Sequence, residues 1–252
     1  MNQFLGKLFL NGKIETQTGL HIGGSRETGE IGGMDNPVIK TANGIPYIPG
    51  SSLKGKMRCT LERAEGKEGA RHSGEPCGCG HCLVCLLFGS HSSDDEKKTV
   101  SRLCVRDAWL DIDDFKEKFP DLIEEKTFTE EKTENIIDRI SGTAKHPRTI
   151  ERVPAGSLFG FEMVLNFFED DRDQIDQLIR FFMRGLRMVE DEYLGGSGTR
   201  GSGKVAFRHL AFSLKRKLEY VGNNTRLPLL TKEDTTFDVD ELINVLMSQL
   251  VG

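Results

Sequence analysis

Long hydrophobic runs are missing from this sequence of 252 residues. No apolar stretch approaches the roughly 18 residues that a membrane-spanning helix needs, and residues 1–10 lack the basic and then apolar pattern of a secretory signal. We also find no internal repeat and no low-complexity tract. Because 37% of the residues are hydrophobic, the chain has enough apolar side chains for a sizeable core, and we expect a cytoplasmic globular protein without a membrane segment.

An excess of positive charge is missing too. The chain carries 34 lysines and arginines against 39 aspartates and glutamates, which gives a formal net charge of -5 at pH 7. This balance argues against a protein that coats nucleic acid indiscriminately, because phosphate neutralisation supplies nonspecific affinity. The charges are segregated, however: residues 107–134 carry 11 acidic side chains and 4 lysines, whereas residues 51–71 carry 6 basic and 3 acidic ones. Basic surfaces can therefore coexist with the acidic total.

Apolar periodicity predicts six elements for the centre of the fold. Alternating apolar residues predict strands at 8–14, 103–109, 159–167 and 205–207, and helical spacing predicts helices at 53–64 and 175–189. Ser51 or Ser52, after Pro49, can cap the first helix. The order strand, helix, strand, strand, helix, strand is the split βαβ arrangement of ferredoxin-like and RNA-recognition domains, so we predict an α+β fold with an antiparallel sheet.

Three long stretches lie outside this predicted core: a glycine-rich loop at 22–48, a cysteine-bearing insertion at 66–99 and a charged segment at 111–154. Insertions of this length in a compact domain are usually functional or disordered. We predict one domain over residues 1–215, and a polar extension over 216–252 that packs on it and contains a short helix at 239–250.

Five glycines lie within residues 195–203, directly after the second predicted helix. Backbone without Cβ atoms can approach a phosphate or ribose closely and direct several N–H donors at it, while Arg200 and Lys204 add positive charge. A helix end followed by a turn would explain one glycine, so five glycines with flanking cations favour contact with a polyanion. A Walker lysine-serine pair does not follow, which argues against a nucleotide-hydrolysing P-loop.

Four of the six cysteines lie within nine residues and predict a metal site, because so tight a cluster does not suit a disulfide framework. Thiolate-rich tetrahedral sites select zinc and are normally structural. Successive C-x2-C spacings favour Cys79, Cys82 and Cys85 as ligands. Cys77 is the expected fourth ligand, but its one-residue spacing from Cys79 leaves His72 and His81 as alternatives.

Other polar residues are ambiguous when taken alone. Lys54 and Arg58 are one helical turn apart, so they either face one ligand or form part of a solvated helix surface. Asp35 lies in an Asp-Asn-Pro sequence that favours a turn, in which the carboxylate bonds nearby backbone. His21 is a lone histidine, which is more often structural than catalytic.

Five motifs, taken together and in order, change this interpretation. They are GLHIGG at 19–24, IGGMDNPVIK at 31–40, IPGSSLKGKMR at 48–58, ENIIDRISGTAKHPRTIER at 134–152 and YLGGSGTRGSGKVAF at 193–207. These motifs make the chain resemble the RAMP superfamily. Within that superfamily it resembles subunit three, the repeated backbone subunit of type III-A CRISPR (Csm) effector complexes. The resemblance runs from about residue 5 to about residue 212 and leaves out the cysteine insertion and the C-terminal end.

The resemblance implies an RNA-binding subunit for antiviral defence. Copies of it would stack along a guide crRNA beside other Csm-complex subunits, and would cut paired target RNA at regular intervals as a metal-dependent endoribonuclease. Asp35 matches the family's catalytic aspartate, which reverses the preference for a turn, and it would work with Mg2+ or another divalent cation or as a base. Residues 127–152 would form a thumb that wedges between base pairs.

The residues that match the family's RNA-contacting positions come from four stretches. They are His21, Ser51, Ser52, Lys54, Arg58, Gly196, Gly198, Thr199, Arg200, Gly201 and Lys204 for the guide, and Arg139 and Arg148 on the thumb. Two other functions stay open: a non-catalytic crRNA-binding scaffold, in which Asp35 is structural, and a stand-alone repeat-processing RAMP endoribonuclease, which would rely on a general acid-base histidine.

Overall fold

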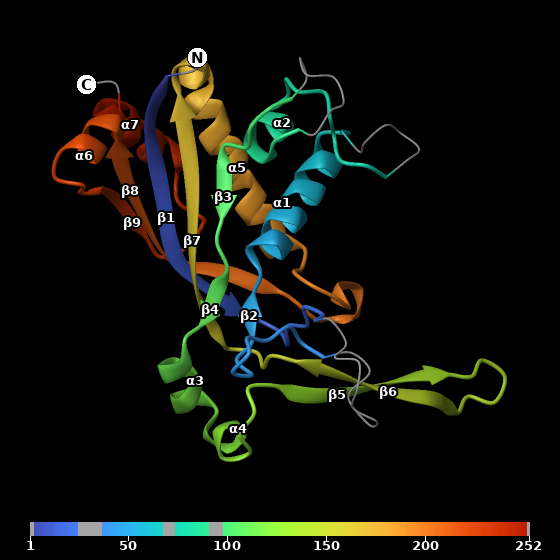
Figure 1. Ribbon diagram of the computed structural model, residues 1–252. Coiled ribbons are helices and arrows are strands. Elements are labelled where there is room, and N and C mark those ends of the chain that lie inside the picture. Colours follow the sequence, from blue (N-terminus) through green and yellow to red (C-terminus); the bar gives the residue numbers. More distant parts are fainter. Residues whose placement is uncertain (1–2, 25–36, 68–73, 91–97, 251–252) are drawn as a thin grey trace.

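An antiparallel sheet forms the centre of the chain in a computed structural model, which describes residues 3–24, 37–67, 74–90 and 98–250 (Figure 1). Its long strands are β1 (Phe4–Thr16), β7 (Leu158–Phe168) and β8 (Val205–Arg216), and the short β3 (Leu103–Val105) and β4 (Ala108–Leu110) pair with β7. The order β4-β7-β1-β8 is that of a split βαβ domain, with the first and third predicted strands side by side. The predicted α+β fold with an antiparallel sheet is therefore confirmed.

The second predicted strand, at 103–109, is divided into β3 and β4. At the break, Asp107 Oδ1 accepts a hydrogen bond of 2.8 Å from the Gly50 N–H at the start of the first helix. A two-residue strand, β2 (Tyr47–Ile48), pairs with β4 at one edge of the sheet, and β9 (Leu227–Lys232) pairs with β8 at the other. The break thus anchors the first helix directly beside the sheet.

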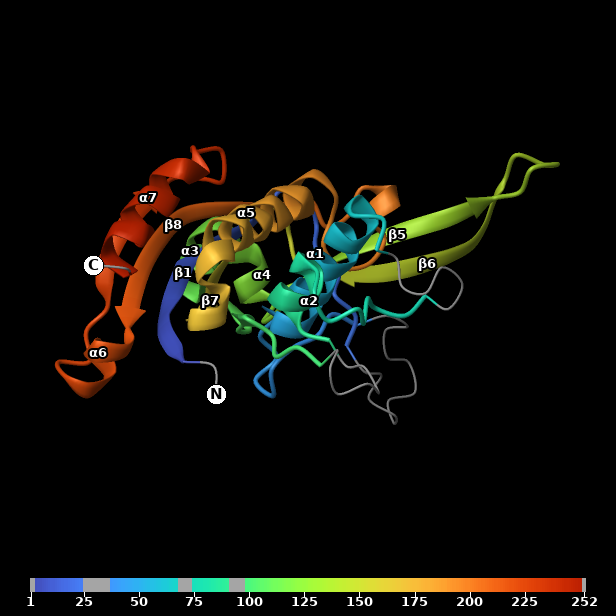
Figure 2. The same cartoon turned by 90° about the horizontal axis from the view of Figure 1, so that it is seen from above.

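The helices α1 (Gly50–Ala64) and α5 (Ile175–Asp191) pack against each other over one face of the sheet (Figure 2). Their predicted apolar stripes are buried, with Met57, Leu61 and Phe182 fully inaccessible to solvent. The predicted serine cap is wrong. Pro49 is the N-cap residue of α1 and no side chain caps the helix, because Ser51 and Ser52 already lie inside its first turn.

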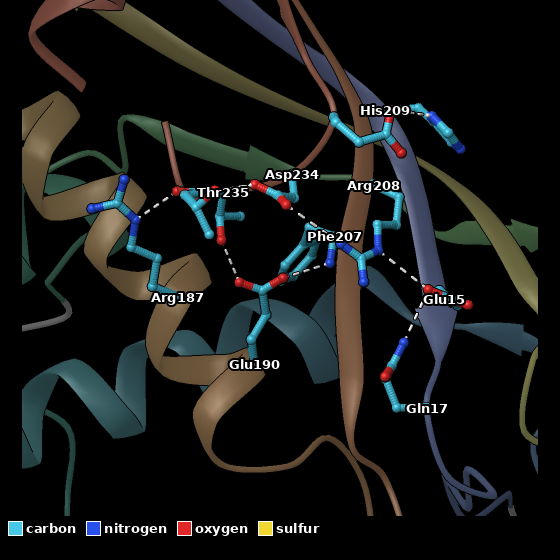
Figure 3. A network of polar contacts seen from close by, with 11 residues as sticks. Glu15, Gln17, Arg187, Glu190, Phe207, Arg208, His209, Asp234 and Thr235 are labelled. Atoms are coloured by element: carbon cyan, nitrogen blue, oxygen red, sulfur yellow. Dashed lines mark hydrogen bonds and ion pairs between the residues drawn. The ribbon is translucent and has the colours of Figure 1, made fainter. Parts of the chain in front are cut away.

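The C-terminal segment is held to this core by polar contacts (Figure 3). It comprises α6 (Lys217–Val221), β9 and α7 (Val239–Leu250), and α7 contacts α5. Glu190 of α5 accepts hydrogen bonds from the Phe207 N–H of β8, at 2.7 Å, and from the Thr235 hydroxyl. Arg187 donates to the carbonyl oxygens of Thr235 and Phe237, at 2.7 Å each. One turn of α5 therefore fixes both β8 and the segment between β9 and α7.

A two-stranded hairpin projects from the body of the protein (Figures 1 and 2). It consists of β5 (Glu130–Ile137) and β6 (Ala144–Arg152), and we call it the thumb. Two short helices precede it, α3 (Ile112–Lys118) and α4 (Pro120–Glu124), while 3-10 turns occupy η2 (Glu169–Gln174) and η3 (Gly198–Arg200). In the described part of the chain, none of the helices is both long and apolar enough to cross a membrane.

Candidate functional site

The glycine-rich loop at 195–203 lies against the GLHIGG stretch. The Gly196 N–H donates to the His21 carbonyl oxygen at 2.7 Å, and the Gly203 N–H donates to the Gly19 carbonyl oxygen at 3.0 Å. A Cβ at Gly195 would lie 2.2 Å from the His21 oxygen, so this glycine is required by packing within the chain. Gly201, with φ of +86°, has no described neighbour within 4 Å. Part of the glycine pattern therefore has a structural cause that the sequence did not reveal.

His21 is placed beside this loop, as the resemblance implied. Its Nδ1 donates a hydrogen bond of 2.7 Å to the carbonyl oxygen of Glu151 in β6, since a carbonyl can only accept. In the neutral ring this leaves Nε2 as an acceptor. The side chain is half-buried. The imidazole ring of His21 is thus held in one orientation between the glycine-rich loop and the base of the thumb.

Asp35 lies outside the described residues, within 25–36, as do Glu27 and Glu30. Both ends of that segment are described. The Gly24 N–H donates to the Pro37 carbonyl oxygen at 3.0 Å, and the Ile39 N–H donates to the Ile22 carbonyl oxygen at 2.8 Å. These bonds hold the two ends next to each other.

The buried carboxylate of Glu151 connects these ends to the thumb. It accepts hydrogen bonds from the Val38 N–H at 2.7 Å and from the Thr129 hydroxyl at 2.6 Å, and it forms an ion pair with Lys40. Burial alone would raise the pKa of Glu151, but the hydrogen bonds from Lys40, Thr129 and Val38 outweigh it and lower the pKa below its usual value. Glu151 therefore stays ionised and joins three separate segments.

A second carboxylate, Glu134, joins the thumb to the glycine-rich loop. It lies 3.3 Å from Arg200, 3.3 Å from Lys132 and 3.6 Å from Arg148. Burial acts to raise the pKa of Glu134, yet the three cations lower it overall. Arg200 also donates to the Ser197 hydroxyl at 2.9 Å. The sequence-predicted Arg148 and Arg200 are thus brought together through a residue that sequence reasoning missed.

Several predicted RNA-contacting residues are exposed to solvent. They are Ser51, Arg139, Thr199, Arg200 and Lys204, with Ser52, Gly196 and Gly198 half-buried. Within the described part of the chain, neither the Arg139 guanidinium nor the Lys204 ammonium forms an ion pair. These two cations are therefore available to a ligand.

Lys54 and Arg58 have different surroundings. Lys54 Nζ donates to Ser101 Oγ and to the Leu103 carbonyl oxygen, at 2.8 Å each, and burial lowers the pKa of Lys54. Arg58 donates to Glu62 Oε1 and to the Cys77 carbonyl oxygen, also at 2.8 Å each. Both cations are directed at protein groups, and their assignment to RNA stays a prediction.

The four clustered cysteines come together. The Sγ atoms of Cys77, Cys79, Cys82 and Cys85 all lie within 4.8 Å of one another. Three of the separations are 3.8–3.9 Å. Tetrahedral zinc–sulfur bonds of about 2.3 Å would separate the sulfurs by about 3.8 Å, so this donor set fits a zinc ion. His81 is exposed, with its Nδ1 2.9 Å from the Cys79 carbonyl oxygen, and His72 lies outside the described residues.

Backbone N–H groups lower the pKa of one of these thiols, Cys79. Burial would raise the pKa of Cys79, but N–H groups of His81 and Cys82 that donate to its sulfur lower the pKa to about 6. Burial raises the pKa of Cys82 and of Cys85. The cluster therefore combines one readily ionised thiol with two that favour the neutral form until a cation replaces their protons.

Glu151 and Glu134 are the residues of this region that sequence reasoning missed. Both belong to the ENIIDRISGTAKHPRTIER motif at 134–152, which is the one sequence signal that includes them. Their partners are distant in sequence: 113 residues separate Glu151 from Val38. Only the fold brings them together.

Comparisons with known proteins agree on one family. A family model described as the RAMP superfamily matches residues 13–206. The "CRISPR system Cms endoribonuclease Csm3" of Methanocaldococcus jannaschii is 44% identical over 249 residues, which cover 97% of this chain and 93% of that protein. The protein of the same name from Methanothermobacter thermautotrophicus is 42% identical over 230 residues, which cover 86% of this chain and 90% of that protein.

Solved structures give the same result. A crystal structure of a Csm3-Csm4 subcomplex in the type III-A CRISPR-Cas interference complex contains a chain that is 34% identical, with a TM-score of 0.61, covering 99% of this chain and 97% of its own length. The crystal structure of Methanopyrus kandleri Csm3 is 26% identical, with a TM-score of 0.60, covering 88% and 81%. The resemblance in the sequence motifs is thereby confirmed, and the chain belongs to the RAMP superfamily and, within it, to the Csm3 family.

Proposed function

We propose that the chain is the backbone subunit of a type III-A CRISPR complex, where it binds guide crRNA and cuts the complementary target RNA. Its relatives at 44% and 42% identity are named as endoribonucleases, and each comparison covers at least 90% of the relative. A solved relative comes from a Csm3-Csm4 subcomplex, which supports other Csm subunits as partners. Further copies of the chain and a cytoplasmic location are part of the proposal.

One observation carries this proposal. His21, the glycine-rich loop, the two ends of the 25–36 segment and the base of the thumb form one connected region. Four of the five motifs that bear the family resemblance thus contribute residues to this region, although they are spread over most of the sequence. Thr199 and Lys204 are exposed in or beside this region, and Arg139 is exposed in the turn between β5 and β6. All three suit an RNA backbone, because charge and N–H donors recognise phosphates without reading sequence.

Base pairing with the guide would supply sequence specificity, and the protein would recognise shape and backbone. The thumb suits a wedge between base pairs, because Ile136, Ile137 and Ile140 are exposed on it. Stacked or unpaired bases can cover such apolar side chains. A wedge at each copy would splay one target nucleotide per copy, which accounts for cuts at regular intervals.

The proposed cleavage uses the nucleophile of the RNA itself. The 2'-hydroxyl of the splayed nucleotide gives its proton to a base and attacks the adjacent phosphorus. The bond to the 5'-oxygen breaks and that oxygen takes a proton from water, so the products are a 2',3'-cyclic phosphate and a 5'-hydroxyl. Asp35 is the proposed base or metal ligand. A divalent cation such as Mg2+ would supply positive charge to the phosphate when bound there.

The four cysteines form the proposed structural zinc site. Cys77, Cys79, Cys82 and Cys85 supply sulfur ligands only, and a closed set of four thiolates leaves no position for substrate. We therefore expect the zinc site to stabilise the fold of the insertion, and we expect catalysis at Asp35.

Replacing Asp35 by alanine tests the catalytic proposal. Complexes assembled from Asp35→Ala and from wild-type chains are given labelled target RNA at equal guide occupancy, with Glu30→Ala as a matched control in the same segment. We expect Asp35→Ala to lower the cleavage rate by orders of magnitude and to leave target binding unchanged. Glu30→Ala should cut at the wild-type rate.

Equal cleavage by Asp35→Ala would favour the non-catalytic scaffold. The repeat-processing enzyme is the other alternative, and it would cut isolated precursor transcripts without a guide, with His21 as its general acid or base. His21→Ala should therefore abolish guide-independent cleavage if that function is right, whereas our proposal expects no such cleavage in wild-type protein.

A further inference from the structure

We propose that Arg58 and Glu62 of α1 are positioning residues for the cysteine metal site, which they serve by fixing the backbone of Cys77. This inference rests on the proposed zinc site and adds to it a support that lies on another element. It also gives Arg58 a role other than contact with the guide RNA.

Both backbone polar groups of Cys77 are bound by one turn of α1. The Cys77 N–H donates to Glu62 Oε1 at 2.9 Å, and the Cys77 carbonyl oxygen accepts from Arg58 Nη2 at 2.8 Å. Arg58 Nε donates to the same Glu62 oxygen at 2.8 Å and closes the arrangement. The peptide groups on either side of the Cys77 Cα are therefore held by charged side chains, whose hydrogen bonds are stronger than neutral ones.

These charged side chains are shielded from water. The Arg58 and Glu62 side chains are only 17% and 10% exposed. The helix that bears them is anchored through Met57 and Leu61, which are fully buried in the core. Because a shielded ion pair is screened less by salt than a surface pair, this contact holds Cys77 in a fixed place relative to the core.

Cys77 needs such support more than the other ligands do. Cys82 is the N-cap of α2 (Leu83–Phe88) and Cys85 lies within α2, so the backbone of that helix orients both sulfurs. The N–H groups of His81 and Cys82 hold the Cys79 sulfur. Cys77 precedes these turns and belongs to no helix or strand. Its partners on α1 replace the local structure that it lacks, in the way that outer hydrogen bonds orient metal ligands in other proteins.

The contacts also account for the short spacing between Cys77 and Cys79. One residue between two ligands leaves little backbone to bring both sulfurs to one ion, so the peptide at Cys77 has to adopt one orientation. In the observed orientation of this peptide, Cys85 Sγ lies 3.3 Å from the Cys77 carbonyl oxygen and 3.8 Å from Cys77 Sγ. The two sulfurs are then close enough to bind one ion. Arg58 and Glu62 select it before the ion binds.

The test measures zinc affinity in the full chain by competition with a chromophoric chelator. Glu62→Ala removes the acceptor for the Cys77 N–H, and we expect it to weaken zinc binding by about 10- to 100-fold. Glu62→Gln keeps an acceptor oxygen and should recover most of the affinity. Glu65→Gln is the matched control, because Glu65 lies at the end of the same helix and pairs with Arg184 at 2.6 Å instead.

A spectroscopic readout separates this role from a general loss of stability. With Co2+ in place of zinc, the visible absorption reports how many thiolates bind, so Glu62→Ala and Arg58→Ala should show a weaker four-thiolate spectrum while Glu65→Gln matches wild type. Zinc affinities equal to wild type in both Glu62→Ala and Arg58→Ala would overturn the inference. Wild-type protein that binds neither Zn2+ nor Co2+ would instead overturn the zinc proposal, and this inference with it.

RNA binding distinguishes the two roles of Arg58. Guide affinity is measured at several salt concentrations for Arg58→Ala and for Lys204→Ala. We expect Lys204→Ala to lower the salt slope by about 0.7, and Arg58→Ala to leave it unchanged because its donors are already bound to protein. A slope lowered equally by both variants would return Arg58 to the RNA-binding residues and contradict the inference.

Discussion

The Val38 N–H and the carboxylate of Glu151 form a hydrogen bond of 2.7 Å across 113 residues of sequence. Val38 follows the 25–36 segment, and Glu151 lies at the base of the thumb in β6. Because Glu151 is buried and also binds Lys40 and Thr129, this carboxylate fixes Val38 and Lys40 relative to the thumb. Its ionisation should therefore be visible in the stability of the protein.

Glu151→Gln should reduce the free energy of unfolding at neutral pH by about 1–3 kcal/mol, because a buried ion pair and charged hydrogen bonds are lost. The pKa of Glu151 is lowered in the folded protein, so its contribution is present above the unfolded value of 4.5 and disappears as the pH falls through the lower folded value. Urea unfolding of both proteins should show a difference at pH 7 that shrinks on acidification.

Glu117→Gln serves as the control for this titration. Glu117 is exposed on α3 and forms no ion pair with a described residue. Its replacement should change stability by less than about 0.5 kcal/mol at either pH. A Glu151→Gln difference that stays constant between pH 7 and the acid range would show that the lowered pKa makes no contribution.

The main strands and helices of the core were predictable because each has a single apolar period. Apolar residues alternate strictly in the strand predicted at 159–167, which corresponds to β7. The helix predicted at 175–189 corresponds to α5, in which Leu178, Phe182 and Leu186 are buried. The hairpin strands of the thumb were not predictable. β5 reads EEKTENII and is mostly exposed, so neither of its faces carries the apolar alternation that predicts a strand. Its antiparallel pairing with β6, from Glu130 opposite Arg152 to Ile137 opposite Ala144, is visible only in the structure.

Glu134→Gln should tighten guide binding. Glu134 neutralises part of the charge of Lys132, Arg148 and Arg200, so its removal leaves more positive charge where the thumb meets the glycine-rich loop. Each additional phosphate contact steepens the salt dependence by about 0.7 for single-stranded RNA. Filter-binding titrations of guide RNA at several salt concentrations measure this slope.

Glu117→Gln changes the net charge by the same amount at a distance from that junction, and should leave both affinity and slope near wild type. Unchanged binding by Glu134→Gln would mean that Arg148 and Arg200 do not approach the RNA. Weakened binding would mean that Glu134 matters because it holds Arg200 in place.

The cluster of four cysteines was predictable from spacing, whereas its surroundings were not. Successive C-x2-C pairs identify sulfur ligands in any fold, and the structure brings the fourth sulfur of Cys77 into the cluster. The contact of Arg58 with Cys77 depends on where the insertion folds back onto α1, and the contact of Lys54 with Ser101 depends on the segment that leads into β3. Helical spacing placed both cations on one surface but carried no information about the residues that cover it.

Removing the metal should loosen the insertion and leave the sheet intact. Chelation is expected to release about one zinc ion per chain, because binding energy in such a site is local folding energy. α2 remains attached to the core through Val84 and Leu87, which are buried. Hydrogen exchange should therefore rise over 74–82 and stay unchanged in β1 and β7. Protein purified without chelator that contains no zinc, or exchange that rises throughout the sheet, would contradict this expectation.

Ile140 at the tip of the thumb is fully exposed, so its side chain contributes nothing to the folded core. Ile140→Ala should leave the unfolding temperature unchanged, since exposed side chains are usually neutral for stability. If the thumb inserts between base pairs, the isoleucine becomes buried there, and burying such a side chain is worth about 1.5–3 kcal/mol. Losing part of this energy should weaken target binding by the guide-loaded complex roughly tenfold and make the cut positions less regular.

Val100→Ala is the control, because Val100 is 75% exposed outside the thumb. Equal target affinity and equal cut positions in Ile140→Ala and Val100→Ala would exclude the thumb tip as the wedge, because a side chain buried between base pairs cannot be shortened without a loss of binding energy.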